Sequence, residues 1–336
     1  MLPADGAGSS ARAARFATAL DMVADRLMFD TTGRRRLRVH DSGIFLLPRA
    51  NVVARLIEAT NENRERAGLA VRVTDWLCRQ GFPAVEPVHE MPYEAGGVVM
   101  TFWRHLPQPP TPPPAPVLAR ALGSLLRELH ALPAPPFRLP TLDPFARLRA
   151  AIEMDAQRSE TVLSRADRAF LLDRIAELGQ AHAGLEFPCG HGLIHNDAHI
   201  GNLLTSAKSP YGYVLADWES TRIGPREVDL VPEGAPGNRF GDSAELRQAF
   251  TDAYGYDVAA WDGWRVLRDA RDVHSLAAYI RVAPNEPAAA HELRHRLATL
   301  RTGDRDSTWR VPAMRDGAQA TEDEGGGVRV KRSGRQ

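Results

Sequence analysis

A short segment in the second half of the chain gathers the polar residues that are most able to do chemistry. Asp197 and Asn202 stand five residues apart, and apolar pairs flank them on both sides, which predicts a loop between two short strands. Residues 205–212 then contain the Ser, Lys, Pro and Gly of a turn, and residues 213–216 run apolar into Asp217. A hairpin of this length would bring Asp217 back beside Asn202.

These side chains would supply two carboxylates and an amide to one place. Mg²⁺ prefers such hard oxygen ligands and keeps several waters, which lets it share the oxygens of a phosphate. Asn202 and Asp217 are therefore the predicted metal ligands. The other carboxylate, Asp197, is then free to orient a hydroxyl or accept its proton, so it is the predicted catalytic residue. His195 and Asp229 are predicted to brace this region rather than to react.

The order of these residues is specific. Residues 195–202 read HNDAHIGN, residues 216–219 read ADWE, and residues 224–230 read GPREVDL. Together the three pieces resemble the signatures of the aminoglycoside phosphotransferase and choline kinase-like family. The resemblance implies a bilobal, protein-kinase-like α+β fold with a small antiparallel-sheet lobe, a mainly helical lobe and ATP between them. It also implies Mg²⁺-assisted transfer of the γ-phosphoryl group to a hydroxyl of a small molecule, such as an aminoglycoside-like antibiotic, an amino alcohol or a sugar.

The same resemblance assigns nucleotide-binding residues to the first lobe. In that family an early strand carries a loop over the phosphates, which corresponds here to Ser42 and Gly43. A later strand carries a cation for the phosphates, which corresponds to Arg55. The strand that leads to the hinge places Thr101 and Trp103 beside the nucleotide. Single glycines and exposed strand arginines also occur with purely structural roles, so that alternative stays open for Ser42, Gly43 and Arg55.

The phosphate-binding cation of the first lobe has to be an arginine. The lysines of the chain are Lys208 and Lys331, and neither follows a glycine. A Gly-Lys-Ser/Thr phosphate loop is therefore excluded.

The helix expected to pair with this cation departs from the family pattern. A helix is predicted over residues 71–80, and the carboxylate that usually pairs with the family's lysine falls at Ala70. Glu62 and Glu65 lie further upstream. This departure makes a nucleotide-binding pseudokinase the main alternative to a working kinase. The preferred hypothesis is that an arginine, being a planar and permanently charged fork, needs no helix carboxylate to orient it.

A zinc-dependent hydrolase is a further alternative. His195, Asp197 and His199 alternate along the segment, so an extended backbone would place them on one face, with His191 close by. This alternative leaves Asn202 and the ADWE phrase without a role.

Helices are predicted again towards the end of the chain, including one long helix over residues 262–282. Four carboxylates in this region could line the site of a cationic substrate: Asp242, Glu245, Asp269 and Asp272. For each of them, a solvated helix face is the preferred explanation.

The composition excludes several classes of protein. The 336 residues are 43% hydrophobic and 25% charged with a formal net charge of zero, which is typical of soluble globular proteins and offers no basic excess for nucleic acid. No apolar run reaches the roughly 18 residues of a membrane span. The two cysteines lie far apart, which fits a reducing cytoplasm. The expectation is a cytoplasmic monomer or weak dimer without a nucleic-acid or membrane partner.

Four stretches are predicted along the chain. Residues 1–106 form the nucleotide-binding lobe with a leading helix, and residues 107–116 form a stiff Pro-rich connection. Residues 117–312 form the helical lobe with the catalytic and metal-binding loops. Residues 313–336, rich in glycine and charge, are predicted to be disordered.

Overall fold

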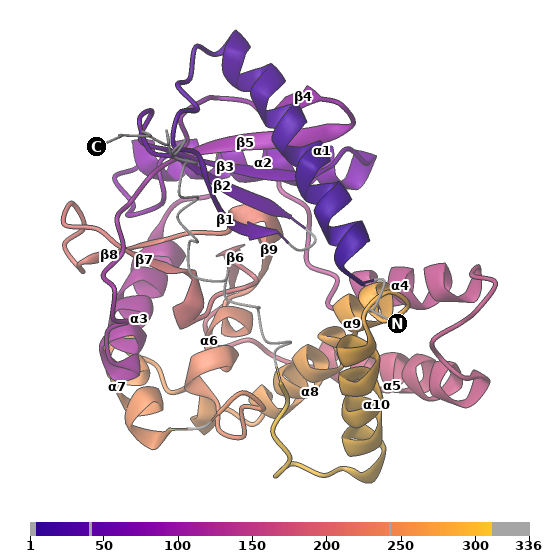
Figure 1. Ribbon diagram of the computed structural model, residues 1–336. Coiled ribbons are helices and arrows are strands. Elements are labelled where there is room, and N and C mark those ends of the chain that lie inside the picture. The colour runs from indigo at the N-terminus through magenta and orange to yellow at the C-terminus, as the bar shows by residue number, and fades with distance from the viewer. Residues whose placement is uncertain (1–4, 40–41, 242, 311–336) are drawn as a thin grey trace, which may run out of the picture.

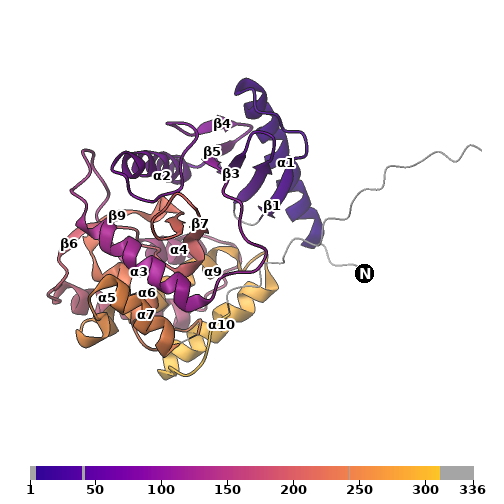
Figure 2. The ribbon, with the colours of Figure 1, turned by 90° about the vertical axis from the view of Figure 1, so that its left-hand side faces the viewer.

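The chain folds into a lobe that contains a sheet and a lobe that is mainly helical (Figures 1 and 2). The computed structural model describes residues 5–39, 42–241 and 243–310. The predicted tail, residues 313–336, lies outside the described residues. The small antiparallel-sheet lobe followed by a helical lobe agrees with the predicted α+β class.

The first lobe is built on a five-stranded sheet in which all neighbouring strands are antiparallel. In spatial order its strands are β1 (Arg35–Val39), β2 (Gly43–Leu47), β3 (Val52–Glu58), β5 (Val98–Arg104) and β4 (Tyr93–Ala95). A tight turn joins β2 to β3, and in it Asn51 has a φ of 53°. This left-handed conformation is one that Asn tolerates better than most residues. The turn sets the register of β3 against β2, where Arg55 lies opposite Ile44, and on its other side β3 places Arg55 opposite Thr101 of β5.

One face of this sheet is closed by the leading helix. Helix α1 (Asp5–Arg26) lies across the sheet (Figure 1). Its Phe16 is fully buried and belongs to one apolar cluster with Leu56 and Met100. This face of the sheet is therefore covered by α1.

The other face carries the predicted nucleotide-binding residues. Side chains alternate along a strand, so Arg55, Thr101 and Trp103 point away from α1. Helix α2 (Asn61–Arg79) packs on this face, where its Ala67 forms a small cluster with residues of β3 and β5. These side chains therefore lie between the sheet, α2 and the second lobe.

Helix α2 begins ten residues before the predicted start at residue 71. Thr60 caps it, because its side chain accepts a hydrogen bond of 3.1 Å from the amide of Asn63. The first turns are polar and exposed, so an apolar pattern alone does not reveal them. As a result Arg66 is a helical residue next to the site.

The second lobe consists of helices and two small hairpin-like sheets. Its helices are α3 (Ala115–Ala131), α4 (Ala146–Ala156), α5 (Arg165–Ala183), α6 (Glu227–Gly234), α7 (Ala244–Tyr254), α8 (Trp264–His274), α9 (Leu276–Val282) and α10 (Pro287–Thr302). Short 3₁₀ turns are η1 (Ile200–Asn202), η2 (Trp218–Ser220) and η3 (Val258–Ala260). The two small sheets pair β6 (His191–Ile194) with β9 (Arg222–Pro225) and β7 (Leu203–Thr205) with β8 (Tyr213–Leu215).

The single long helix predicted over residues 262–282 is broken at Ser275. The Ser275 hydroxyl donates a 2.7 Å hydrogen bond to the carbonyl of Asp272, one turn back, and such local bonds compete with the helical ladder. Helix α8 therefore ends at His274, whose Nδ1 lies 2.9 Å from the carbonyl of Pro144, just before α4. The break brings the end of α8 close to the start of α4.

Candidate active site

The loop between β6 and β7 presents Asp197 to solvent and is held from behind. Both oxygens of the buried Asp229 carboxylate accept backbone hydrogen bonds of 2.7 Å, one from His195 and one from Asn196. Asn196 has a φ of 64°, a left-handed conformation that turns the chain sharply. The side-chain amide of Asn202 donates to the carbonyl of Asp197 at 2.8 Å. Asp197 is thus exposed on a loop whose backbone is fastened at both ends.

The predicted hairpin is confirmed, and it brings Asp217 next to this loop. Strands β7 and β8 pair in antiparallel fashion, with Leu203 opposite Leu215. One step further, the amide of Ala216 donates to the carbonyl of Asn202 at 2.9 Å. Asp217 follows with φ 65° and ψ 58°. Left-handed non-glycine residues are uncommon and gather at functional sites.

Arg55 reaches across from the first lobe and binds the ADWE motif. Its Nη1 donates to Oδ1 of Asp217 at 2.9 Å, and its Nη2 donates to Oε2 of Glu219 at 2.9 Å. The same Glu219 oxygen accepts from Nη2 of Arg66 at 3.1 Å. Helix α2 therefore contributes an arginine one turn before Ala70, the position where the family pattern places a carboxylate, and the carboxylate that binds Arg55 comes from the second lobe.

Glu219 is the site residue whose role the sequence left unassigned, although it stands in the ADWE phrase. Its side chain is only 7% exposed and accepts from two guanidinium groups. A buried carboxylate needs such partners. The sequence did contain one signal for it: because the helix lacks a carboxylate at Ala70, another acid was needed as the partner of Arg55.

Arg55, Asp217 and Glu219 shift one another's pKa values. Burial acts to raise the pKa of Asp217, but the charge and hydrogen bond of Arg55, together with the charges of His195 and Arg66, hold that pKa below its usual value. Burial raises the pKa of Glu219 against the attraction of Arg55, and repulsion by Asp217 adds to the rise. Burial lowers the pKa of Arg55, but the charges of Asp217 and Glu219 raise it overall. Arg55 and Asp217 are both charged at neutral pH.

The other predicted nucleotide-binding residues lie on two strands of the first lobe, Thr101 and Trp103 at β5 and Ser42 and Gly43 at β2. Thr101 is buried, and its Oγ1 accepts a 2.9 Å hydrogen bond from Nε1 of Trp103. Both share the sheet face of Arg55. Ser42 is half-buried at the start of β2, and Gly43 follows it inside the sheet. A Cβ on Gly43 would lie 2.6 Å from the ring of Phe16, so packing alone accounts for a glycine there.

Asn202 and Asp217 fit a magnesium ion. The Asn202 amide nitrogen is committed to the Asp197 carbonyl, which leaves its Oδ1 available. Arg55 occupies Oδ1 of Asp217, while no hydrogen bond reaches Oδ2 within the described part of the chain. A cation held here would have one amide and one carboxylate oxygen from the protein and would take its remaining ligands from water and phosphate.

The zinc alternative is wrong. No group of three His, Cys, Asp or Glu residues that could hold a metal exists among residues 5–39, 42–241 and 243–310. His195 is turned inward, with Nε2 at 2.9 Å from the carbonyl of Ala216, as expected for a bracing residue. Nδ1 of His199 accepts from the amide of Gly201 at 3.1 Å. The segment is not extended, because Asn196 is left-handed, so the alternating side chains do not share a face.

Comparison with known proteins decides the family. A family model described as APH, the phosphotransferase enzyme family, matches residues 33–269. The chain belongs to the APH phosphotransferase family. The match spans the strand of Arg55, the Asp197 loop and the ADWE motif. No curated protein matches the chain.

Solved structures show the same fold at low sequence identity. A spectinomycin phosphotransferase in complex with ADP and spectinomycin has a TM-score of 0.56 and 15% identity, with 84% of this chain and 94% of that chain covered. A choline/ethanolamine kinase family protein from Mesorhizobium loti has a TM-score of 0.57 and 19% identity, with 83% and 94% covered. A type VIII aminoglycoside-3'-phosphotransferase has a TM-score of 0.57 and 19% identity, with 77% and 99% covered. The predicted bilobal protein-kinase-like fold of this APH family member is confirmed.

Within the described ranges, no helix of the APH chain combines the length and the apolar character needed to cross a membrane.

Proposed function

We propose that this APH family member transfers the γ-phosphoryl group of ATP to a hydroxyl of a small molecule with the help of Mg²⁺. The observation that carries the proposal is the convergence of Arg55, Asp197, Asn202 and Asp217, which come from both lobes. Phosphoryl transfer requires a cation at the phosphates, ligands for the metal and a group that orients the attacking hydroxyl. Each of these has a candidate in the site.

Asp197 is the group that receives the acceptor. Its carboxylate is exposed, and within the described residues no hydrogen bond occupies it. The acceptor oxygen forms a bond to the γ-phosphorus as the bond from that phosphorus to the bridging oxygen of ADP breaks. The acceptor proton passes to Asp197. The backbone restraints around the loop keep this carboxylate in position during the step.

Asn202, Asp217 and Arg55 handle the nucleotide. Asn202 and Asp217 would hold Mg²⁺, which when bound neutralises charge on the phosphate oxygens. Arg55 would present one or both of its terminal nitrogens to the phosphates, as guanidinium groups do in paired hydrogen bonds. Glu219 and Arg66 keep the Arg55 side chain extended toward the site. Thr101 and Trp103 are proposed to lie at the nucleotide, with Ser42 and Gly43 over the phosphates.

The two observations that favoured the pseudokinase alternative have another explanation. It rested on the missing lysine and on the missing carboxylate at Ala70. Arg55 supplies a charged group at the site, and Glu219 supplies its carboxylate partner at 2.9 Å. Paired in this way, Arg55 needs neither Glu62 nor Glu65.

The proposal is tested by comparing the variant Asp197→Asn with the wild-type protein. ATP consumption is measured over a panel of hydroxylated compounds, and ATP affinity is measured separately by calorimetry. Wild type should consume Mg·ATP with at least one acceptor. The variant should lose about 10²–10⁴-fold in turnover while its ATP affinity changes little, because Asp197 is assigned to the hydroxyl. Equal losses of turnover and ATP affinity would remove Asp197 from that role. ATP binding without consumption for any acceptor would replace the proposal by the pseudokinase.

A further inference from the structure

Arg55 is bound to a residue that the proposed function assigns to the metal. Its Nη1 donates to Oδ1 of Asp217 at 2.9 Å, and this ion pair joins a strand of the first lobe to the second lobe. Arg55 is the proposed cation for the phosphates, and Asp217 is a proposed ligand of Mg²⁺. The structure therefore shows two residues bound to each other that are proposed to bind different parts of Mg·ATP.

The other end of the Arg55 guanidinium is held more deeply. Its Nη2 donates to Oε2 of Glu219 at 2.9 Å, and the same oxygen accepts from Nη2 of Arg66 at 3.1 Å. The side chain of Glu219 is 7% exposed, whereas that of Asp217 is 35% exposed. Removing a partner from a buried charge costs more than removing it from an exposed one. Arg55 therefore releases Asp217 more easily than it releases Glu219.

The two acids are fixed in place by the residue between them. Trp218 is 1% exposed, its Nε1 donates to the carbonyl of Leu215 at 2.9 Å, and its ring meets that of Phe82 edge-on. Asp217 and Glu219 thus lie on either side of a buried side chain. The side chain of Arg55, in contrast, has several rotatable bonds. It is the part of this cluster that is able to change partners.

Binding of Mg·ATP would change the partners of Arg55 through charge. In the cluster, the charges of Arg55 and Arg66 are balanced by those of Asp217 and Glu219. Asp217 would be compensated by Mg²⁺, and the guanidinium of Arg55 would be repelled by the same ion. Arg55 would gain the phosphate oxygens, which a guanidinium binds in paired, charge-assisted hydrogen bonds. Its Nη1 is then stabilised more by the phosphates than by Asp217.

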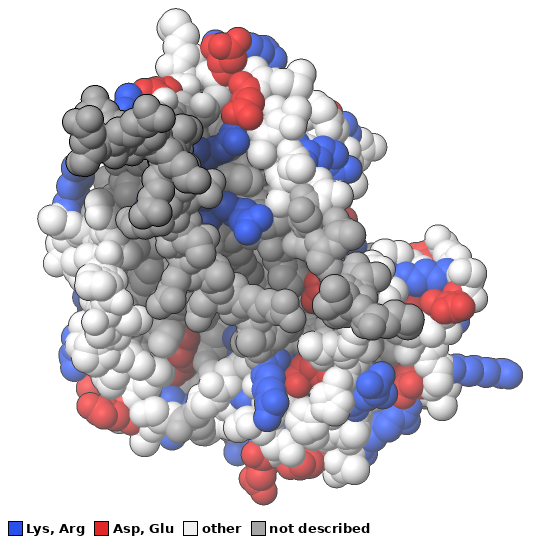
Figure 3. Space-filling model, viewed as in Figure 1, with Lys and Arg blue, Asp and Glu red and all other residues white. Residues whose placement is uncertain are grey.

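The surface around the site also favours the phosphates. Figure 3 shows lysine or arginine side chains on the upper part of the hollow between the lobes. A concave surface lined by one sign of charge raises the local concentration of ions of the opposite sign. The phosphates of a nucleotide would therefore enter a basic environment here.

We propose that Arg55 moves its Nη1 from Asp217 to the ATP phosphates when Mg²⁺ binds Asp217, and that Glu219, held by Arg66, anchors its Nη2 throughout. Nη1 exchanges a carboxylate oxygen for a phosphate oxygen, while the bond from Nη2 to Glu219 persists. Glu219 and Arg66 are thus positioning residues, and the ion pair between Arg55 and Asp217 makes nucleotide binding depend on the metal. The inference deepens the proposed phosphotransferase function and rests on it.

The test measures ATP affinity by calorimetry, once with Mg²⁺ and once with EDTA. Four proteins are compared: wild type, Asp217→Asn, Arg55→Ala and the double variant. Asp217→Asn keeps the size of the side chain and loses its charge, so it no longer competes for Nη1 of Arg55. In EDTA this substitution should tighten ATP binding about tenfold or more, as expected for a hydrogen bond between charged groups. With Mg²⁺ it should weaken ATP binding, because the metal loses a ligand.

The double variant separates the released hydrogen bond from the loss of a negative charge. Loss of the Asp217 charge alone should favour ATP by the same factor whether or not Arg55 is present. Release of Nη1 requires Arg55, so the gain from Asp217→Asn in EDTA should be about tenfold larger with Arg55 than in Arg55→Ala. Asp197→Asn is the matched control. It removes the same charge, and within the described residues Asp197 has no bond to Arg55, so its effect should be equal in both backgrounds.

Glu219→Gln tests the anchor. This variant keeps the shape of the side chain and loses the charge that holds Arg55 and Arg66. The affinity for Mg·ATP should fall about tenfold, and Arg66→Gln, at a half-buried position, should cause a smaller loss in the same direction. Glu94→Gln is the control and should leave this affinity unchanged, because Glu94 pairs at 2.8 Å with Arg64, an exposed residue of the same helix α2.

Two outcomes overturn the inference and leave the phosphotransferase function standing. In one, Asp217→Asn fails to tighten ATP binding in EDTA, or tightens it equally with and without Arg55. In the other, both Glu219→Gln and Arg66→Gln bind Mg·ATP as tightly as wild type. A third outcome, absence of ATP binding to wild type both with Mg²⁺ and with EDTA, removes the proposed function and this inference with it.

Discussion

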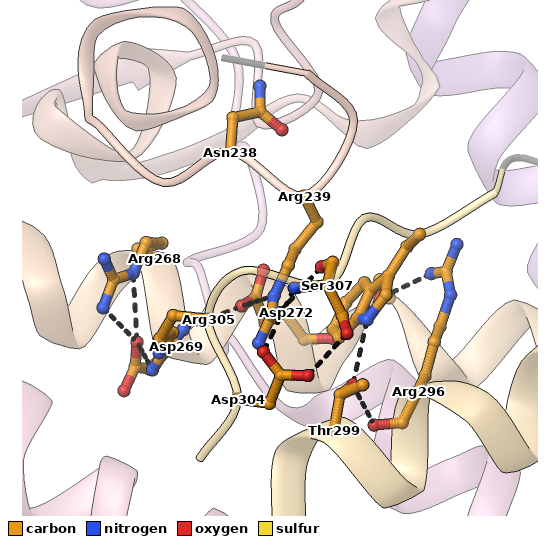
Figure 4. A network of polar contacts seen from close by, with 12 residues as sticks. Asn238, Arg239, Arg268, Asp269, Asp272, Arg296, Thr299, Asp304, Arg305 and Ser307 are labelled. Carbon is orange, nitrogen blue, oxygen red and sulfur yellow. Dashed lines mark hydrogen bonds and ion pairs between the residues drawn. The ribbon is translucent and has the colours of Figure 1, made fainter.

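Two clusters of this protein are both built from arginines and acids, and they differ in how deeply their side chains are buried and in how completely their charges are paired. The active-site cluster consists of Arg55, Arg66, Asp217 and Glu219. The C-terminal cluster consists of Arg239, Asp269, Asp272, Arg296 and Arg305, which Figure 4 labels, and of Glu292, which pairs with Arg296. In the C-terminal cluster the side chains of Arg239 and Arg296 are each 1% exposed, whereas those of Arg55 and Asp217 are 23% and 35% exposed.

The C-terminal cluster satisfies its charges internally. Arg296 donates to Glu292 at 3.0 Å, to the Ser275 hydroxyl at 2.9 Å and to the Tyr279 hydroxyl at 2.7 Å. Its guanidinium also lies 4.0 Å from the centre of the Tyr279 ring. The guanidinium of Arg296 is thus paired within the protein.

In the active-site cluster, by contrast, some polar atoms have no hydrogen-bond partner among the described residues. Within the described residues, Oδ2 of Asp217 and the carboxylate of Asp197 accept no hydrogen bond, and the backbone of Asp217 is left-handed. The difference teaches that charges buried deep in the fold are paired with one another, whereas the more exposed charges of the proposed active site keep atoms available for a ligand.

The largest expected effect follows from Asp217→Ala. Activity with Mg·ATP should fall about 10³-fold or more, because a metal ligand contributes several kcal/mol to transition-state stabilisation. The fold should persist, since Arg55 keeps its bond to Glu219. ATP consumption and the melting temperature are both measured, with the exposed Glu245→Ala as control. Retained activity with a normal melting curve would refute the metal assignment.

A smaller effect, on stability alone, is expected in the C-terminal cluster. Glu292→Ala leaves the buried Arg296 charge without its carboxylate, which should lower the free energy of unfolding by about 3–5 kcal/mol. Denaturant unfolding measures this loss. ATP affinity of the remaining folded protein should match wild type. A variant as stable as wild type, or one that loses ATP affinity while folded, would contradict the distinction between the two clusters.

Arg55→Ala should have the most moderate effect of the three. Loss of its charge-assisted hydrogen bonds should weaken ATP binding about 10–100-fold, which corresponds to roughly 1.5–3 kcal/mol. Glu62→Gln and Glu65→Gln serve as matched controls and should change ATP affinity less than about twofold, because Arg55 is held by Glu219 instead. Calorimetric titration with Mg·ATP distinguishes them. A silent Arg55→Ala, in a protein that binds ATP without consuming it, would favour the pseudokinase.

Much of the site was predictable because it is local in the chain. The loop with Asp197 and Asn202 and the hairpin to Asp217 span about twenty residues, and turn residues and apolar pairs specify such a unit without help from distant parts. Strand alternation likewise predicted that Arg55 lies opposite its apolar neighbours. Helix α2 was predicted only from its apolar half, because its first turns are polar and depend on the cap at Thr60.

The sequence by itself thus determined the family, the loop that carries Asp197 and Asn202, and the face of the strand that carries Arg55. Only the tertiary structure decided which partners the charged residues have. Arg55 and Asp217 are 162 residues apart, and no local pattern states whether a charge on a helix faces solvent, a partner or a hollow. Asp269 pairs with Arg174 of α5, and Asp272 pairs with Arg239 and Arg305, because α8 packs beside these residues. Long-range contacts of this kind depend on how whole elements pack, so a local pattern in the sequence does not reveal them.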